Sequence, residues 1–141
     1  LNLMAHALSY NENVWNKNDP YKSLDKFNNK LTKKYGWISL NNIDNLYPLN
    51  PISALLISAI SKRSFAQNQR TIFGFLNSVE PFGFKSTYIT NYNTKNFYYS
   101  PSDLWDYMYA NLDTSIVNST DSHNWITCRL WVSTMTPIFL Q

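Results

Sequence analysis

The chain has 141 residues and a formal net charge of +3, and its charged residues amount to only 15% beside 44% hydrophobic residues. This apolar content can fill the core of one domain, so disorder throughout is excluded. A single cysteine, Cys128, excludes an internal disulfide and with it a disulfide-stapled secreted domain. No apolar run approaches the roughly 20 residues of a membrane span, and no signal peptide is visible. We therefore expect a cytoplasmic protein without a membrane partner.

Two helices are expected in the N-terminal third. Apolar residues recur at helical spacing over residues 1–8. Asp19 and Pro20 form a cap and a first turn for the second helix, and Gly36 is suited to its C-terminal end.

The segment from Lys17 to Lys34, which includes most of the second helix, carries half of the twelve basic residues of the chain. Interleaved aromatic residues give this segment a resemblance to a nucleic-acid-binding surface. The same aromatic positions match the apolar stripe of the helix, so a solvated lysine face is the preferred interpretation. The lysines are Lys17, Lys22, Lys26, Lys30, Lys33 and Lys34.

A stronger helical signal lies in the centre of the chain. Asn50 can cap a helix that begins at Pro51, and a broad apolar stripe follows it. Lys62 and Arg63 are expected in the last turn of this helix, where cations complement the helix dipole. A second, nearly all-apolar helix is expected over residues 68–76.

The C-terminal half alternates between aromatic and helical patterns. Residues 84–99 mix aromatic, β-branched and polar side chains, which fits a short β-hairpin or an extended aromatic loop. Ser100 and Pro101 repeat the cap-and-proline pattern before another amphipathic helix. A last helix is expected over residues 121–131, and the pattern after residue 126 is less regular.

These patterns predict a mainly α fold, a helical bundle with a short β-hairpin or an extended aromatic loop around residues 84–99. We expect residues 1–141 to form a single helical domain. Because the sequence opens at Leu1 in the middle of a helical pattern, we expect it to be a fragment of a larger protein.

No complete catalytic or metal-binding constellation is recognisable. The three glycines do not form a phosphate-binding loop followed by Lys and Ser or Thr. His6, His123 and Cys128 are too scattered for zinc-ligand spacing. On a helix, His123 and Cys128 would lie about 140° apart, so a buried apolar cysteine is favoured over a thiol–imidazole pair. Asp103 and Asp106 share a helix face, and compensation of the helix dipole is favoured over paired-carboxylate chemistry.

One dense polar cluster lies beside the apolar helices, and we call it the polar corner. Its arginines and amides can bind a phosphate or the backbone of a partner. Alternatively, they cap the two neighbouring helices and satisfy the turn between them, which the residue pattern alone favours. The polar corner comprises Arg63, Gln67, Asn68, Gln69 and Arg70.

The segment LYPLNPISALLISAISKRSFAQNQRTIFGFLNSVEPFGF resembles a motif of large bacterial P-loop ATPases, several of them suspected of roles in phage defence. In that family, Tyr-Pro-Leu-His-Pro and an apolar run precede Gln-Asn-Glu-Arg-Thr-Leu-Phe and Phe-Leu. The later stretch SPSDLWDYMYANLDTSIVNS is similar to the family's continuation, so the resemblance covers residues 43–125. The matching residues are Tyr47, Pro48, Leu49, Pro51, Gln67, Asn68, Arg70, Thr71, Phe73, Phe75 and Leu76.

Two departures from the family motif concern polar residues. Asn50 stands where His is usual, and Asn still caps a helix well. Gln69 stands where Glu is usual, which removes a carboxylate that could pair with Arg70. The tail after Trp125 also fits the family poorly.

The resemblance implies that the nucleotide-binding core lies outside this chain. ATP and Mg²⁺ would then bind in the parent protein, with no cofactor in this chain. The chain itself would be an accessory, lid-like helical region that couples nucleotide state to neighbouring domains. Arg70 is the first candidate for a contact with a nucleotide phosphate or an adjoining domain, followed by Arg63, Asn68 and Gln67. The alternative is a non-enzymatic helical module that binds a protein or a nucleic acid, with residues 82–99 as the protein-binding surface.

Overall fold

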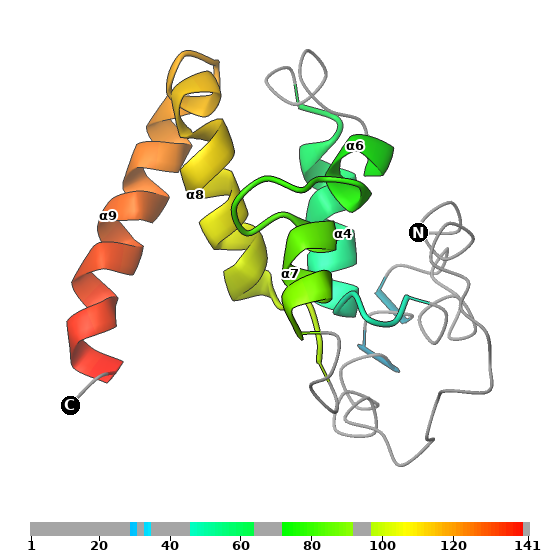
Figure 1. Ribbon diagram of the computed structural model, residues 1–141. Coiled ribbons are helices and arrows are strands. Elements are labelled where there is room, and N and C mark those ends of the chain that lie inside the picture. Colours follow the sequence, from blue (N-terminus) through cyan, green and yellow to red (C-terminus); the bar gives the residue numbers. More distant parts are fainter. Residues whose placement is uncertain (1–28, 31–32, 35–45, 64–71, 92–96, 140–141) are drawn as a thin grey trace, which may run out of the picture.

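The computed structural model describes residues 29–30, 33–34, 46–63, 72–91 and 97–139. The mainly α fold class is confirmed in this part of the chain. Figure 1 shows α4, α6 and α7 grouped on one side of α8, while α9 runs along its other side at the edge of the molecule. The helices are α4 (Pro51–Ile60), α6 (Ile72–Leu76), α7 (Phe84–Asn91), α8 (Pro101–Val117) and α9 (Ser122–Phe139).

Helix α4 begins where its cap predicts. The Asn50 side chain accepts a hydrogen bond from the Ile52 amide at 2.9 Å, and Pro51 occupies the first turn. The sequence predicts Lys62 and Arg63 in the last turn of this helix, which is wrong. The helix ends at Ile60, and both residues lie in the turn after it. Their amides donate to carbonyls three residues back, which tightens the chain and ends the α-helix.

Helix α8 also begins at its predicted cap. Ser100 and Asp103 form a capping box, in which the Ser100 amide donates to Asp103 at 2.7 Å and the Asp103 amide donates to Ser100 at 3.3 Å. The buried residues of the helix then recur at helical spacing along one stripe. They are Leu104, Tyr107, Leu112 and Ile116.

The expected β-hairpin or extended loop around residues 84–99 is wrong for residues 84–91, which form helix α7. The rings of Phe84 and Tyr88, one helical turn apart, are stacked with their centroids 6.4 Å apart. The side chains of Thr90 and Asn91 donate to carbonyls four residues back, so the polar residues are satisfied within the helix. Residues 92–96 lie outside the described part.

The core lies between α8 and the group formed by α4, α6 and α7. Phe75 is its aromatic centre, with ring centroids 5.2 Å from Tyr107, 5.6 Å from Tyr99 and 6.2 Å from Phe84. Edge and tilted ring contacts of this kind add to the free energy of burial. The buried core residues are Leu46, Leu49, Ala54, Ile57, Phe75, Phe84, Tyr99, Leu104, Tyr107, Leu112, Ile116 and Trp125.

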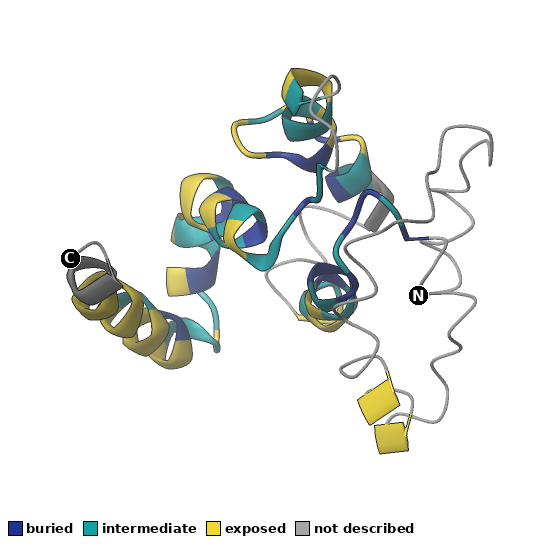
Figure 2. Cartoon of the chain, turned by 90° about the horizontal axis from the view of Figure 1, so that it is seen from below, coloured by how far each residue is buried: buried dark blue, intermediate teal, exposed yellow. Residues whose placement is uncertain are grey.

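Helix α9 extends further than expected, through Phe139 and not only to residue 131. Its serines and threonines interrupt the apolar pattern, but their hydroxyls donate to carbonyls of the preceding turn, as Thr127 does to His123 at 2.9 Å. Figure 2 shows the helix largely exposed. Trp125 is buried, and its indole donates to Asp113 of α8 at 2.6 Å. None of the helices that the structure describes is both long enough and apolar enough to span a bilayer.

Several expected elements lie outside the described residues, namely the helix over residues 1–8, most of the lysine helix and residues 68–71 of the second central helix. At the end of the lysine helix, residues 29–30 and 33–34 are helical and exposed. The exposed lysines there, Lys30, Lys33 and Lys34, agree with a solvated lysine face.

Candidate functional site

Arg63, the one residue of the polar corner that the structure describes, contacts the turn between α8 and α9. Its Nη1 lies 3.2 Å from Oδ1 of Asp121, 58 positions along the chain. The Arg63 side chain is 62% exposed, whereas that of Asp121 is 21% exposed. A guanidinium carries five N–H donors in a planar fork, so one carboxylate oxygen leaves Arg63 with donors that face solvent.

Asp121 is held in place by its own turn. Its amide donates to the Ser119 hydroxyl at 3.1 Å, and that hydroxyl donates to the Ile116 carbonyl at 2.7 Å. The Asp121 carbonyl accepts the first helical bond of α9, from the Trp125 amide at 3.0 Å. These bonds hold the backbone of Asp121 in the turn between α8 and α9, and Arg63 is the more exposed side chain of the pair.

The other predicted contact residues, Gln67, Asn68 and Arg70, lie outside the described residues, as does Gln69. Their roles stay predictions. What the structure adds is the position of the chain on both sides of them. Arg63 lies in the turn after α4, which ends at Ile60, and α6 begins at Ile72, so the other residues of the polar corner lie between these two helices in the sequence.

A second feature is the junction between residues 46–51 and residues 97–103. Leu49 and Tyr99 form an isolated parallel β-bridge, the one β pairing among the described residues. The Tyr99 amide donates to the Pro48 carbonyl at 2.8 Å, and the Asn50 amide donates to the Tyr99 carbonyl at 3.0 Å. Ser53 donates to the same carbonyl, so the start of α4 is joined to the residue before the cap of α8.

The Tyr99 side chain extends this junction to the next turn. Its hydroxyl lies 2.8 Å from the Phe82 carbonyl and 3.1 Å from the Asp103 carbonyl, both of which accept from it. Burial, with a smaller contribution from Asp103, raises the pKa of the Tyr99 hydroxyl far above its usual range. Tyr99 therefore acts as a neutral structural donor at neutral pH and not as an acid or base.

The turn formed by residues 78–83 displays Phe82 in an unusual backbone conformation. Phe82 has a φ of +60°, which is uncommon for a bulky residue, and its side chain is 51% exposed. Asn111 of α8 donates to the Pro81 carbonyl at 2.9 Å. Gly83 is buried, and a Cβ there would lie 2.7 Å from the Ser78 carbonyl oxygen. These contacts hold the backbone of the turn, and Val79 and Phe82 are its exposed large apolar side chains.

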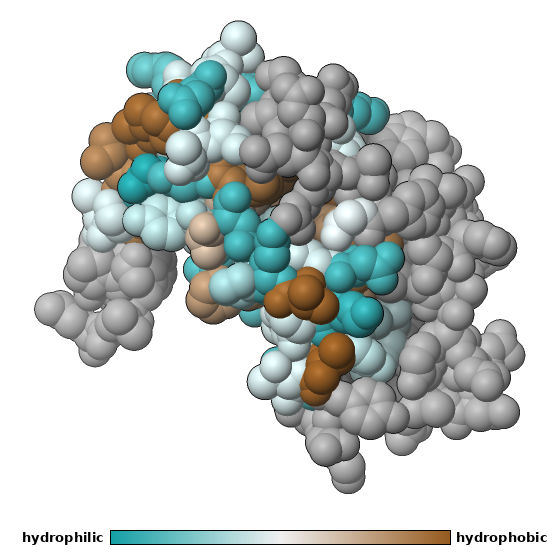
Figure 3. Space-filling view, turned by 45° about the horizontal axis from the view of Figure 1, so that its top comes forward, coloured by the Kyte–Doolittle hydropathy of each residue, from teal (hydrophilic) through white to brown (hydrophobic). Residues whose placement is uncertain are grey.

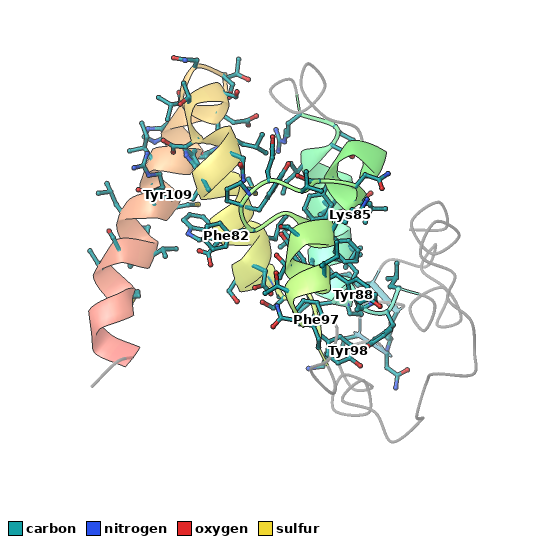
Figure 4. The ribbon with its side chains drawn as sticks, in the orientation of Figure 1. Phe82, Lys85, Tyr88, Phe97, Tyr98 and Tyr109 are labelled. Carbon is teal, nitrogen blue, oxygen red and sulfur yellow. The ribbon has the colours of Figure 1, made fainter. Side chains whose placement is uncertain are left out.

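The aromatic residues around α7 divide into two groups. Figure 4 shows Tyr88, Phe97 and Tyr98 gathered near one end of α7, whereas Phe82 lies beside α8. Tyr88, Phe97 and Tyr98 are half-buried, with Tyr98 in edge contact with Tyr47 at 5.3 Å. They therefore pack against the protein, and Phe82 presents the more exposed ring.

The interpretation of Cys128 as a buried cysteine is wrong, because it is exposed on α9. His123 is also exposed on that helix. Asp103 belongs to the capping box, as its position near a helix start predicts, and Asp106 is exposed. In the described part of the chain, no three His, Cys, Asp or Glu side chains come together in a way that could bind a metal ion.

The pairing of Arg63 with Asp121 was not visible in the sequence, because nothing in the local pattern connects positions so far apart. The same is true of Asn111 and Asp113, whose side chains hold the 78–83 turn and α9 respectively. Comparison with known protein families, characterised proteins and solved structures finds no match to this chain.

Proposed function

We propose that this chain is a non-catalytic helical accessory region of a larger P-loop ATPase, in which it couples nucleotide state to neighbouring domains. The resemblance of residues 43–125 to that family motivates the proposal. The observation that carries it is the junction at Leu49 and Tyr99. Leu49, in the first motif stretch, forms a β-bridge with Tyr99, which lies about fifty residues along the chain and directly before the second stretch at Ser100; such a long-range link is the behaviour of one folded unit.

The polar corner offers a physical route for the coupling. An exposed ion pair such as Arg63–Asp121 contributes about 0–1 kcal/mol, so Arg63 can leave Asp121 for a stronger anionic partner at little cost. A phosphate or a carboxylate of an adjoining domain is such a partner for a guanidinium. Because Asp121 lies at the start of α9, release of Arg63 frees the end of α4 from the α8–α9 turn.

The reading frame that encodes the parent protein gives the first test. A glycine-rich loop that ends in Lys-Ser or Lys-Thr upstream of residue 1 supports the proposal, and a complete gene without one contradicts it.

The second test uses the intact parent protein. At saturating ATP, Arg63→Ala should reduce the effect of ATP on protease cleavage between α4 and α6. Lys85→Ala is the matched control, since Lys85 is an exposed cation on α7 outside the polar corner. Equal cleavage patterns for the wild type with and without ATP would refute coupling through this region.

A non-enzymatic protein-binding module is the second candidate, and the 78–83 turn favours it. Holding a bulky residue at positive φ costs on the order of 1 kcal/mol or more, and such strain is often found at functional sites. A preorganised, exposed aromatic ring is a typical anchor of a protein interface.

A photo-crosslinking residue placed at position 82 of the intact protein tests this second candidate. It should link to one defined segment, whereas the same residue at Val79, which is 71% exposed on the same turn, should not. Equal labelling from both positions would contradict a specific role for Phe82.

A further inference from the structure

The lysine helix, which the sequence predicts between Pro20 and Gly36, carries charges that the proposed ATPase role does not use. Its described residues, 29–30 and 33–34, are helical and exposed, and Figure 2 shows them in yellow. Three of these residues are lysines, namely Lys30, Lys33 and Lys34. Both a face that meets only water and a face that binds an anionic partner must be exposed, so the arrangement of the charges has to separate the two.

The lysines follow one side of the predicted helix. Successive residues of an α-helix are about 100° apart, so residues three or four positions apart lie on the same side. In the described part, Lys33 and Lys34 have this spacing from Lys30. Steps of four residues back from Lys30 reach Lys26 and Lys22, both outside the described residues. The spacing predicts that these five lysines form one stripe, about 120° wide and about 18 Å long, which we call the lysine stripe.

The signs of the charges distinguish the lysine stripe from an ordinary solvated face. On solvated helices, opposite charges usually stand three or four residues apart, because such pairs stabilise the helix and like-charged pairs destabilise it. In the lysine stripe, lysines stand four residues apart at positions 22 and 26, 26 and 30, and 30 and 34. Asp25, the one acidic residue between Pro20 and Gly36, has this spacing to Lys22 alone among the five. The stripe therefore opposes helix formation, and an anionic partner would remove the repulsion.

The rest of the described chain has no such excess of one sign. Its residues from position 46 onward include four Lys or Arg and five Asp or Glu. Two of these cations form ion pairs, Arg63 with Asp121 and Arg129 with Asp113. Figure 3 shows hydrophilic and hydrophobic side chains of the described residues interspersed over one face of the molecule. Attraction of a polyanion should therefore depend on the lysine stripe.

We propose that the lysine stripe binds the phosphate backbone of a nucleic-acid duplex without reading its sequence. Duplex DNA carries one negative charge per about 1.7 Å of its axis, so a stripe about 18 Å long meets roughly ten of them. Lysine is a point charge without the planar fork that reads base edges, so its contacts carry no sequence information. Phe27 and Tyr35 fall on the apolar side of the predicted helix, where they cannot stack on bases held by the stripe, so a duplex is favoured over a single strand.

An anionic membrane is the other polyanion that basic helices bind, and it would take the apolar side of the helix into the lipid. That side comprises Leu24, Phe27, Leu31 and Tyr35, which fall within about 80° of one another. This width is below the roughly 100° of an apolar stripe that faces a protein core. The lysine stripe is the wider of the two, which favours a partner that binds through charge alone.

Fluorescence anisotropy of a labelled DNA duplex of about 20 base pairs, titrated with the full chain, measures the binding. The dissociation constant should lie at about 10⁻⁴ to 10⁻⁶ M at physiological salt, as for other non-specific contacts. The logarithm of the association constant should fall with the logarithm of salt concentration with a slope of about −4, because each lysine–phosphate contact contributes about −0.9. Two duplexes of unrelated sequence should give the same values. No nucleotide is present, so the result is independent of the ATPase proposal.

A matched pair of double variants tests the site. Lys30→Gln with Lys33→Gln should weaken binding and make the slope shallower by about 2. Lys62→Gln with Lys85→Gln removes the same charge from exposed residues outside the stripe and should leave the slope unchanged. Glutamine has nearly the helix propensity of lysine, so circular dichroism should be the same for both variants.

Lys30→Glu separates binding from helix stability. It converts the repulsive spacings to Lys26 and Lys34 into attractive ones, so helical circular dichroism should stay equal or rise while duplex binding weakens. A merely solvated face predicts no change in binding. Each of three results overturns the proposal: a duplex that stays free at about 50 mM salt, equal losses for the two double variants, or binding to phosphatidylserine vesicles but not to the duplex.

Discussion

The helices packed on the two sides of α8 carry similar apolar residues, but these residues differ in burial. On one side, the helix packs against α4, α6 and α7 around Phe75, and its side chains there are buried. On the other side, α9 covers α8 but leaves its own Leu130 and Trp131 exposed. Apolar composition is therefore not what separates core from surface in this chain. Burial depends on whether a third element closes over the pair of helices.

The polar groups of the Leu49–Tyr99 junction and those of α9 also differ, in whether they bond to distant residues or to their own helix. In the junction, the backbone of Tyr99 bonds to Pro48 and Asn50, and its hydroxyl bonds to Phe82, so distant segments depend on one another. On α9, the hydroxyls of the exposed residues Thr127 and Thr134 donate to carbonyls of their own helix. Substitutions at the junction should therefore lower the free energy of unfolding more than substitutions of these exposed α9 residues.

The largest expected effect is that of Phe75→Ala. Removing a buried ring in contact with three other aromatic rings should lower the free energy of unfolding by about 3–5 kcal/mol. Urea unfolding followed by circular dichroism measures the loss. Leu130→Ala is the control, because Leu130 is exposed, and it should change the free energy of unfolding by less than about 0.5 kcal/mol. Similar losses of unfolding free energy for the two variants would contradict the distinction between the core around Phe75 and the exposed side of α9.

Tyr99→Phe should come next, with a loss of about 1–3 kcal/mol at neutral pH, because the Phe82 and Asp103 carbonyls lose the partly buried hydrogen bonds donated by the Tyr99 hydroxyl. The folded-state pKa of Tyr99 is raised, so the stability it contributes is complete below the unfolded-state pKa of about 10 and decreases as pH rises above it. The difference in the free energy of unfolding between wild type and Tyr99→Phe should therefore become smaller above about pH 10. Urea unfolding at neutral and alkaline pH checks this, and a constant difference would count against it.

Asp113→Ala should have an intermediate effect, confined to α9. The Asp113 carboxylate accepts from the Trp125 indole at 2.6 Å and from Arg129 at 2.9 Å, and both contacts hold α9 on α8. Their partial exposure limits the loss to about 1–2 kcal/mol. Hydrogen exchange should become faster in α9 and stay unchanged in α4. Faster exchange in both helices would show that α9 is part of the core unit.

Arg63→Ala should have the smallest effect, less than about 1 kcal/mol, because its ion pair with Asp121 is largely exposed. Salt should weaken the ion pair further. The difference in stability between Arg63→Ala and the wild type should therefore disappear at about 1 M salt, where charges are strongly screened. Thermal unfolding at low and high salt measures this. A loss of several kcal/mol would mean that Arg63 is committed to the fold and is not available to a phosphate or a partner.

Part of the candidate site could be predicted from the sequence, and part could not. Arg63 was identified from its place among arginines and amides, yet its partner Asp121 could not be, because the ion pair depends on how α4 packs beside α8. Phe82 was within the expected aromatic surface, but its positive φ follows from bonds made by Asn111 and Tyr99. Cys128 was expected to be buried because of its residue type, and its exposure follows from the open side of α9.

The sequence by itself determined the mainly α class and the starts of α4 and α8. Asn50 with Pro51, and Ser100 with Pro101 and Asp103, act through hydrogen bonds that span two or three residues, so no distant segment is needed to fix them. Only the tertiary structure decided that residues 84–91 are helical and that Tyr99 joins α4 to α8. Those outcomes depend on contacts between residues far apart in the chain, and a local pattern carries no information about which distant surface will be present.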